Sequence, residues 1–314
     1  MIINKDLINL FAMSTARAAY GASLFKGKND KIAADKAAVD EMRKQLNSIN
    51  MRGTVVIGEG ELDEAPMLFI DEKLGTNKGD ELDIAVDPLE GTNFVAKNLP
   101  NALSVIAVAR KNSLLRAPDM YMEKIAIGPS LPENLVNLDY DVKKNIKLLA
   151  EAKNTTPDNL TACILKRPRH DLLISSLKEL NVKINFISDG DVSGVISVAY
   201  PQSKIDIYIG IGGGPEGVLA AAALKCLGCQ MQTRLKFYKD DEKERAKNFG
   251  IKNLNYKYNI NDMVKGDVIF CSTGVTDGDL VKGIKVNKDY FESETFVLHK
   301  GSNTNKKIKH KIKK

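Results

Sequence analysis

The stretch from Asp80 to Phe94 constrains this chain most, because a predicted strand ends there in a turn rich in oxygen ligands. Ile84–Val86 has the character of a short buried strand, and Pro88 should close it since proline cannot donate to a strand ladder. Asp87 and Glu90 stand three residues apart at the carboxyl end of that strand. Two carboxylates this close repel each other unless a cation neutralises them, and oxygen ligands suit Mg²⁺ or Mn²⁺. A solvated acidic turn is the alternative, since acidic turns are common.

A second acidic turn repeats the pattern upstream. The β-branched run at 55–57 ends in Gly58, and acidic side chains crowd the residues that follow. These acids are Glu59, Glu61, Asp63 and Glu64. The sequence therefore predicts two oxygen-rich turns, each at the end of a strand.

Asp35 is a third candidate for a metal site. An apolar stripe at helical spacing runs along the predicted second helix, through Ala38, Val39, Met42, Leu46 and Ile49. Asp35 falls at the centre of this stripe near the amino end of the helix, so its carboxylate should point toward the core. The alternative is a helix cap, for which Asp is well suited.

The second half of the chain alternates strands with helices, as a mostly parallel α/β sheet does. The predicted strands at 160–165, 184–187 and 205–211 each lead into a polar turn. Ligands in such sheets bind beyond the carboxyl ends of the strands, so the three turns should share one edge. The first turn carries Lys166, Arg167 and Arg169, which could hold a phosphate or form a solvated basic surface.

The third turn, Gly212–Gly217, satisfies the GxGxxG pattern of a dinucleotide site after a strand and before a helix. A dehydrogenase is therefore one candidate class. We reject it because Glu216 would repel a pyrophosphate, and the following strand-like segment at 230–237 ends without an acid for the ribose. An open glycine turn that carries a carboxylate suits a metal-bound phosphate better.

Several of these segments, in this order, resemble one known family. The resemblance extends from about residue 30 to about residue 285 and includes VIGEGELDEAPM (56–67), DIAVDPLEGTN (83–93), DMYMEK (119–124), RPRHD (167–171), SDGDV (188–192) and GGGPEGVLAAAAL (212–224). These segments are similar to the signatures of class II fructose-1,6-bisphosphatase, within the lithium-sensitive sugar and inositol phosphatase superfamily. The resemblance implies a layered α/β/α/β/α sandwich with mixed sheets.

The resemblance also implies an activity. Such an enzyme is a metal-dependent hydrolase, with Mn²⁺ or Mg²⁺, that converts fructose 1,6-bisphosphate to fructose 6-phosphate and phosphate in gluconeogenesis. Action on sedoheptulose 1,7-bisphosphate, alone or in addition, and action on another sugar or inositol phosphate are the alternatives within the same fold. The small-molecule sugar bisphosphate is the expected partner, and we expect a homo-oligomer, a dimer or a tetramer.

Matching position by position, the resemblance assigns roles to residues of this sequence. The metal ligands would be Asp35, Glu59, Asp87, Glu90 and Glu216. Asp63 and the Thr92 hydroxyl would orient and deprotonate the attacking water. Substrate would contact Glu90, Gly91, Thr92, Tyr121, Arg167, Pro168, Arg169, Asp189, Gly190, Asp191 and Gly213.

The charge and the cysteines exclude other classes. The lysines at 306, 307, 309, 311, 313 and 314 account for the whole net charge of +6, so the rest of the chain is formally neutral and nucleic-acid binding loses its main support. Four cysteines at 163, 226, 229 and 271 make no disulfide framework, and the one CxxC lacks the second pair that a zinc site needs.

The sequence also predicts the organisation and location of the chain. No apolar run approaches the roughly 18 residues that span a bilayer, and we expect no membrane partner and a cytoplasmic protein. We expect an N-terminal metal-binding part at 1–155, a C-terminal substrate-binding part at 156–304, and a disordered basic tail at 305–314.

Overall fold

The computed structural model describes residues 2–58 and 67–314, and it divides into two compact units. Unit 1 comprises Met1–Arg116 and Val264–Lys314, and unit 2 comprises Ala117–Met263. The expected boundary after residue 155 falls inside unit 2, and the chain returns to unit 1 after residue 263. Strand pairing between distant segments causes this return, because β11 (Val268–Gly274) lies beside β4 (Leu103–Arg110) in one sheet.

Unit 1 is built on an eight-stranded mixed sheet with the order β12-β13-β11-β4-β3-β1-β2, and β14 pairs with β13. The remaining strands are β1 (Met51–Ile57), β2 (Lys73–Leu74), β3 (Asp80–Glu90), β12 (Lys285–Val286), β13 (Tyr290–His299) and β14 (Thr304–Lys313). β1 and β3 run parallel, whereas the other neighbours are antiparallel. This arrangement places the carboxyl ends of β1 and β3 at one edge of the sheet.

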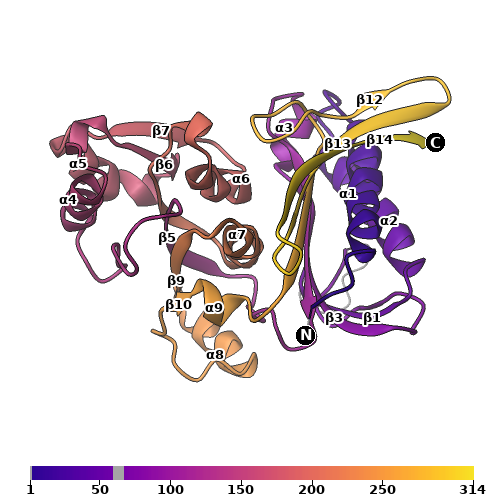
Figure 1. Cartoon of the computed structure of the whole chain (residues 1–314), viewed down its shortest axis with the longest axis horizontal. Coiled ribbons are helices and arrows are strands. Elements are labelled where there is room, and N and C mark those ends of the chain that lie inside the picture. Colours follow the sequence, from indigo (N-terminus) through magenta and orange to yellow (C-terminus); the bar gives the residue numbers. More distant parts are fainter. Residues whose placement is uncertain (1, 59–66) are drawn as a thin grey trace. The chain divides into compact units, whose positions relative to one another are not determined.

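The helices α1 (Leu7–Ser23) and α2 (Lys31–Asn47) lie together beside this sheet (Figure 1). They form a hydrophobic core with alternate residues of the strands, and all five members of the apolar stripe predicted for the second helix are buried in it. The small residues of α1, such as Ala12, Ala16 and Ala19, allow the helix to pack closely. The core thus fixes the face that α2 turns toward β3.

The end of β3 differs from the prediction. Pro88 was expected to close the strand, yet β3 continues to Glu90 and pairs with β4 through Asp87 opposite Val105 and Glu90 opposite Leu103. The register shifts between Asp87 and Glu90, so the strand accommodates Pro88 at an irregularity where no ladder hydrogen bond is needed from its nitrogen. The short helix α3 (Thr92–Ala96) follows immediately.

The prediction of a disordered tail at 305–314 is wrong. Residues 305–313 lie in β14, which pairs antiparallel with β13 from Tyr290 opposite Lys313 to His299 opposite Thr304. The strand alternates lysines with Ile308, His310 and Ile312, and Ile312 is buried in the core of unit 1. The composition of the tail suggested disorder, whereas its period of two provides an apolar face for the sheet.

Unit 2 contains a six-stranded mixed sheet with the order β10-β9-β5-β8-β6-β7. The strands are β5 (Tyr121–Ile127), β6 (Thr161–Leu165), β7 (Lys183–Ile187), β8 (Ile207–Gly213), β9 (Gln230–Lys236) and β10 (Tyr258–Asn259). The α-helices are α4 (Val142–Ala152), α5 (Asp171–Glu179), α6 (Asp191–Ile196), α7 (Gly214–Leu227), α8 (Asp240–Asn248) and α9 (Ile260–Met263). The short 3₁₀ helices are η1 (Pro157–Asn159), η2 (Pro168–His170), η3 (Ser197–Ala199) and η4 (Pro201–Ser203).

Unit 2 has three layers. α4 and α5 form a hydrophobic core with one face of the sheet through residues such as Ile146, Leu149 and Leu177, whereas α6 and α7 contribute nothing to that core and pack together against β5 and β8. Figure 1 shows α4 and α5 together and α7 on the other side of β5. The prediction of an α/β fold with mixed sheets is confirmed. The succession of five layers depends on the placement of both units and stays a prediction.

The strands β6, β7 and β8 are mutually parallel, as predicted. The basic turn after β6, the Asp189–Asp191 turn after β7 and the glycine turn after β8 therefore all leave the same edge of the sheet. Among the described residues, no helix is long and apolar enough to cross a membrane.

Candidate active site

The acids of unit 1 lie on α2 and at the end of β3. The capping role weighed for Asp35 falls instead to Asp30, whose Oδ1 accepts a hydrogen bond from the Ala33 amide at 2.9 Å. Asp35 therefore lies inside α2, and its Oδ1 atom is shielded from solvent, as are Oδ1 of Asp87 and Oε2 of Glu90. Shielded carboxylate oxygens are what a metal site needs, because a bound cation offsets the cost of removing them from water.

Gly91 makes the turn between β3 and α3 possible. Its φ of 82° lies in the left-handed region, which residues other than glycine rarely adopt. A Cβ at this position would lie 2.7 Å from Cδ2 of Phe94. Thr92 follows as the first residue of α3, and Glu90 before it is only 4% exposed. The predicted catalytic hydroxyl thus lies two residues from a buried predicted ligand.

Two of the predicted residues, Glu59 and Asp63, lie outside the described residues. Within 2–58 and 67–314, the side chains contain no group of three or more His, Cys, Asp or Glu that could hold a metal ion. Asp35, Asp87 and Glu90 belong to unit 1, and Glu216 belongs to unit 2. The joint ligand set named from the sequence stays a prediction.

In unit 2, Arg169 is fixed in place by its surroundings. Its Nε and Nη2 atoms donate to the carbonyl oxygen of Ile211 at 3.1 and 2.8 Å, and its guanidinium lies 4.7 Å from the centre of the Tyr121 ring. Tyr121 is 42% exposed and meets the edge of Tyr238. A guanidinium that is already held by hydrogen bonds and by an aromatic ring loses little further freedom when it binds a phosphate. Arg167, which precedes the turn of Pro168, donates to the Lys166 carbonyl.

His170 ties the same basic turn to β8. Its Nδ1 donates to the Leu165 carbonyl at 2.7 Å, and its Nε2 accepts from the Ile211 amide at 2.8 Å, which requires the neutral imidazole. Burial lowers the pKa of His170, and the neighbouring Arg169 adds to this, although the Leu165 carbonyl opposes it. His170, to which the sequence analysis assigned no role, therefore positions the predicted phosphate-binding turn.

We expect the free energy of unfolding to decrease as the pH falls below about 6.5, the ordinary pKa of histidine. In that range the unfolded chain takes up a proton at His170 that the folded chain excludes, so stability is complete above pH 6.5 and is lost toward the lowered folded pKa. The loss is at most about 1.4 kcal/mol per pH unit for one histidine.

Denaturant unfolding at pH 7.5, 6.5 and 5.5 measures this loss. Burial also lowers the pKa of His310 and raises that of Glu216, so the pH dependence of His310→Gln is compared with that of the double variant His170→Gln/His310→Gln, which differs only at His170. An equal pH dependence in the two variants would contradict the neutral, buried imidazole.

The Asp189–Asp191 turn shows an arrangement that the sequence did not predict. Gly190 occupies the left-handed region with a φ of 81°, and Asp191 begins α6. The Asp191 carboxylate is buried and points inward, where Oδ2 accepts from Lys124 and Oδ1 accepts from the Tyr208 hydroxyl. The sequence signal for this arrangement was Lys124, which shares one face of β5 with the apolar residues Met122 and Ala126. Asp189 is half-buried, and its Oδ1 accepts from the Gly190 amide.

Glu216 lies in the first turn of α7 and folds back over the glycine turn. A Cβ at Gly213 would lie 1.9 Å from its Oε2 atom, which is shielded from solvent and has no hydrogen-bond partner in the described part of the chain. Burial raises the pKa of Glu216, while the Lys124 ammonium opposes the rise. A buried carboxylate oxygen without a donor fits a divalent cation, the ligand that would stabilise its charge.

The structure also disfavours the dinucleotide alternative. In a dinucleotide-binding βαβ unit, the strand after the glycine-bearing helix pairs directly with the strand before it. Here β9, which follows α7, is not a neighbour of β8, because the antiparallel strand β5 lies between them. The carboxylate of Glu216 also fills the space above Gly213 that a pyrophosphate would need.

Two of the four cysteines are buried as thiols. Burial raises the pKa of Cys163 and Cys229 to about 12. Both thiols are protonated at neutral pH, and the thiolate is the form that binds metals and attacks disulfides.

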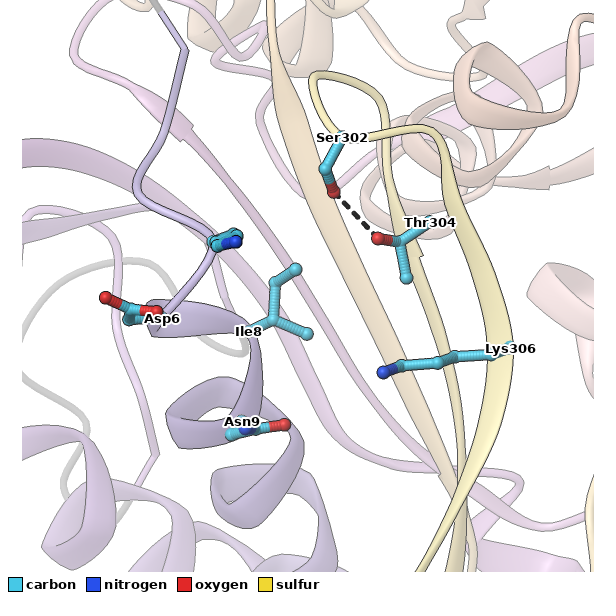
Figure 2. A pocket seen from close by; sticks show the side chains of 7 residues that line it. Asp6, Ile8, Asn9, Ser302, Thr304 and Lys306 are labelled. Carbon is cyan, nitrogen blue, oxygen red and sulfur yellow. Dashed lines mark hydrogen bonds between the residues drawn. The ribbon is translucent and has the colours of Figure 1, made fainter.

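A pocket of about 250 Å³ lies in unit 1 beside the start of α1 (Figure 2). It is lined by Lys5, Asp6, Ile8, Asn9, Ser302, Thr304 and Lys306, none of which the sequence assigned to the site. Ser302 bonds Thr304 and the imidazole of His299, whose other nitrogen contacts Asp267. These bonds hold the β13–β14 turn.

Comparison with known proteins places the chain in a class of phosphatases. The model of bacterial fructose-1,6-bisphosphatase, glpX-encoded, matches residues 5–312. The chain belongs to this family and is a phosphatase of the hydrolase class. Divalent-metal dependence is a general property that this family implies.

Individual relatives agree with this assignment over nearly their whole length. The class 2 fructose-1,6-bisphosphatase of Haemophilus influenzae is 40% identical, over 98% of this chain and 96% of its own length. Fructose-1,6-bisphosphatase 1 class 2 of Escherichia coli is 41% identical, over 98% of this chain and 95% of its own. The match to a solved IMPase of Thermotoga maritima covers 64% of this chain and 79% of the IMPase chain, at 14% identity and a TM-score of 0.31.

Proposed function

We propose that this chain hydrolyses the 1-phosphate of fructose 1,6-bisphosphate to give fructose 6-phosphate and phosphate, with Mn²⁺ or Mg²⁺ as the cofactor. The observation that carries the proposal is the family match, which extends from residue 5 to residue 312. The two relatives that bear this name align with 98% of the chain and with 96% and 95% of their own length.

The residues that would hold the metal are Asp35, Asp87, Glu90 and Glu216, together with Glu59. The shielded oxygens of the four described acids and the unsatisfied Oε2 of Glu216 support this set. When bound, a divalent cation neutralises the charge of a phosphate ester and makes water more acidic.

The chain's own groups would perform the remaining steps. Asp63 and the Thr92 hydroxyl would orient a water molecule and accept its proton as the water oxygen bonds to phosphorus and the bond from phosphorus to the C1 oxygen breaks. Arg169, held by the Ile211 carbonyl and by Tyr121, would receive the distal phosphate with Arg167. The backbone around Gly190 and Gly213 would contact the sugar.

Purified protein with saturating Mn²⁺, then with Mg²⁺, tests the proposal against a panel of phosphate esters. The panel contains fructose 1,6-bisphosphate, sedoheptulose 1,7-bisphosphate, fructose 6-phosphate and inositol 1-phosphate, and free phosphate is measured. We expect kcat/KM to be highest for fructose 1,6-bisphosphate, with fructose 6-phosphate as the product. Phosphate release from inositol 1-phosphate alone would contradict the proposal.

Sedoheptulose 1,7-bisphosphate is the strongest competitor, because it carries the same phosphorylated terminus on a longer sugar. A kcat/KM for it above that for fructose 1,6-bisphosphate would reassign the substrate within the same chemistry. The homo-oligomeric state and the cytoplasmic location remain predictions from the sequence.

A further inference from the structure

Unit 2 contains a buried charged cluster beneath two of the predicted substrate turns. Lys124, in the middle of β5, is 0% exposed, and its ammonium group donates to Oδ2 of Asp191. The Tyr208 hydroxyl, from β8, donates to Oδ1 of the same carboxylate. Burial, together with the negative charge of Asp191, keeps the pKa of Tyr208 above its usual value, so its proton is available for this bond.

This arrangement is costly unless both charges stay paired. Removing an ammonium and a carboxylate from water costs several kcal/mol for each ion, and only close pairing with further hydrogen bonds offsets the cost. Both oxygens of Asp191 accept hydrogen bonds from groups inside the protein, which hold the carboxylate in place from β5 and β8. Three apolar side chains in place of Lys124, Asp191 and Tyr208 could fill the same space without this cost of desolvation. We therefore look for a role of the charged pair in the substrate site.

The position of the pair links two turns. Asp191 is the first residue of α6 and ends the Asp189–Asp191 turn. Its Oδ2 atom lies close to β8, because a Cβ at Gly212 would be only 2.1 Å from it. The Lys124 side chain runs along the start of α7, where a Cβ at Gly217 would lie 3.2 Å from its Cε and 3.8 Å from its Nζ.

The ammonium therefore faces both turns at once. The ammonium group donates a hydrogen bond to Asp191. Its positive charge lowers the pKa of Glu216, whereas the negative charge of Asp191 raises it. Gly212 and Gly217 leave the room that this side-chain arrangement needs.

We propose that Lys124 is a positioning residue for the substrate site, which ties the Asp189–Asp191 turn after β7 to the Gly212–Glu216 turn after β8 through the buried carboxylate of Asp191. The proposal deepens the proposed function and rests on it.

The test is a double-mutant cycle of Lys124→Met, Asp191→Asn and the two together, assayed with fructose 1,6-bisphosphate at saturating Mn²⁺. We expect Lys124→Met to raise KM at least about tenfold and to change kcat less than about threefold, because a displaced binding turn weakens ground-state and transition-state binding alike. The double variant should be no worse than Lys124→Met, since both changes remove the same interaction.

Lys153→Met is the matched control. Lys153 bonds Asp206 in the same unit, before the start of β8 and at the opposite edge of the sheet from the turns. Its kinetic constants should match those of the wild type. An unchanged KM in folded Lys124→Met, or single effects that multiply in the double variant, would overturn the proposal.

A second readout needs neither metal nor substrate. The thermal unfolding midpoints of the same variants, measured with a chelator present, should show that the double variant is more stable than Lys124→Met, because no unpaired charge stays buried. If the decreases in unfolding midpoint of the two single variants add in the double variant, Lys124 and Asp191 are not coupled and the proposal is overturned. A wild-type protein without phosphatase activity would refute the proposed function alone.

If Lys124→Met does not fold, Tyr208→Phe replaces it in the cycle. This change removes only the hydroxyl that donates to Asp191. It should raise KM about threefold, because a factor of three corresponds to the loss of one hydrogen bond that contributes roughly 0.5 to 1 kcal/mol. An unchanged KM in Tyr208→Phe would also overturn the proposal.

Discussion

Asp87→Asn should reduce phosphate release from fructose 1,6-bisphosphate by at least about a thousandfold at saturating Mn²⁺, because the change removes a charge that the bound cation requires. Asp87 lies at the irregular end of β3, where its Oδ1 is shielded from solvent. Asparagine has nearly the same shape, so the strand pairing opposite Val105 should persist. The measured turnover therefore reports on the bound metal, whereas the unfolding midpoint without metal reports on the stability of the fold.

The matched control lies on the same strand. Asp80 begins β3, is 41% exposed in its side chain and pairs with Arg110 at 2.7 Å. Asp80→Asn should leave kcat and KM unchanged and lower stability by no more than about 1 kcal/mol, since an exposed ion pair contributes little. Near wild-type turnover in Asp87→Asn would show that Asp87 is not a metal ligand.

Gly213→Ala should lower kcat/KM by at least about a hundredfold while the protein stays folded. Gly213 has a φ of −67°, which alanine adopts freely, so the backbone is not strained. The new Cβ would nonetheless lie 1.9 Å from Oε2 of Glu216 and 2.8 Å from its Oε1. Only the end of a flexible side chain must move, and the movement takes the carboxylate away from the position proposed to bind metal.

A control at the other end of α7 separates this effect from a general loss of the helix. Gly228 caps the carboxyl end of α7 with a φ of 71°, a conformation that asparagine tolerates, and a Cβ added there would meet no atom within 4 Å. Gly228→Asn should keep the wild-type kcat/KM. If Gly213→Ala also keeps it, the placement of Glu216 has no bearing on catalysis.

Local patterns in the sequence predicted much of what surrounds the site. The stripe from Ala38 to Ile49 identified the buried face of α2, and the polar turns after β6, β7 and β8 share one edge because parallel strands align their carboxyl ends. These features depend on neighbouring residues and on side-chain period, which a single sequence displays.

Features that depend on distant segments were not predicted. The return of the chain to unit 1 rests on the pairing of β11 with β4, and the order in β14 rests on its ladder with β13. Lys124 and Asp191 are 67 positions apart, so no local pattern showed that the carboxylate would turn inward. Composition alone misled at the lysine-rich β14, because a strand with one apolar face can carry lysines on the other.

The central claim is that acids of this chain bind a divalent cation on which phosphate release depends. The most direct measurement is phosphate release from fructose 1,6-bisphosphate by protein stripped with a chelator, before and after titration with Mn²⁺. We predict no measurable release in the stripped protein and full recovery, with fructose 6-phosphate as product, when Mn²⁺ returns. Undiminished release in excess chelator would contradict the account.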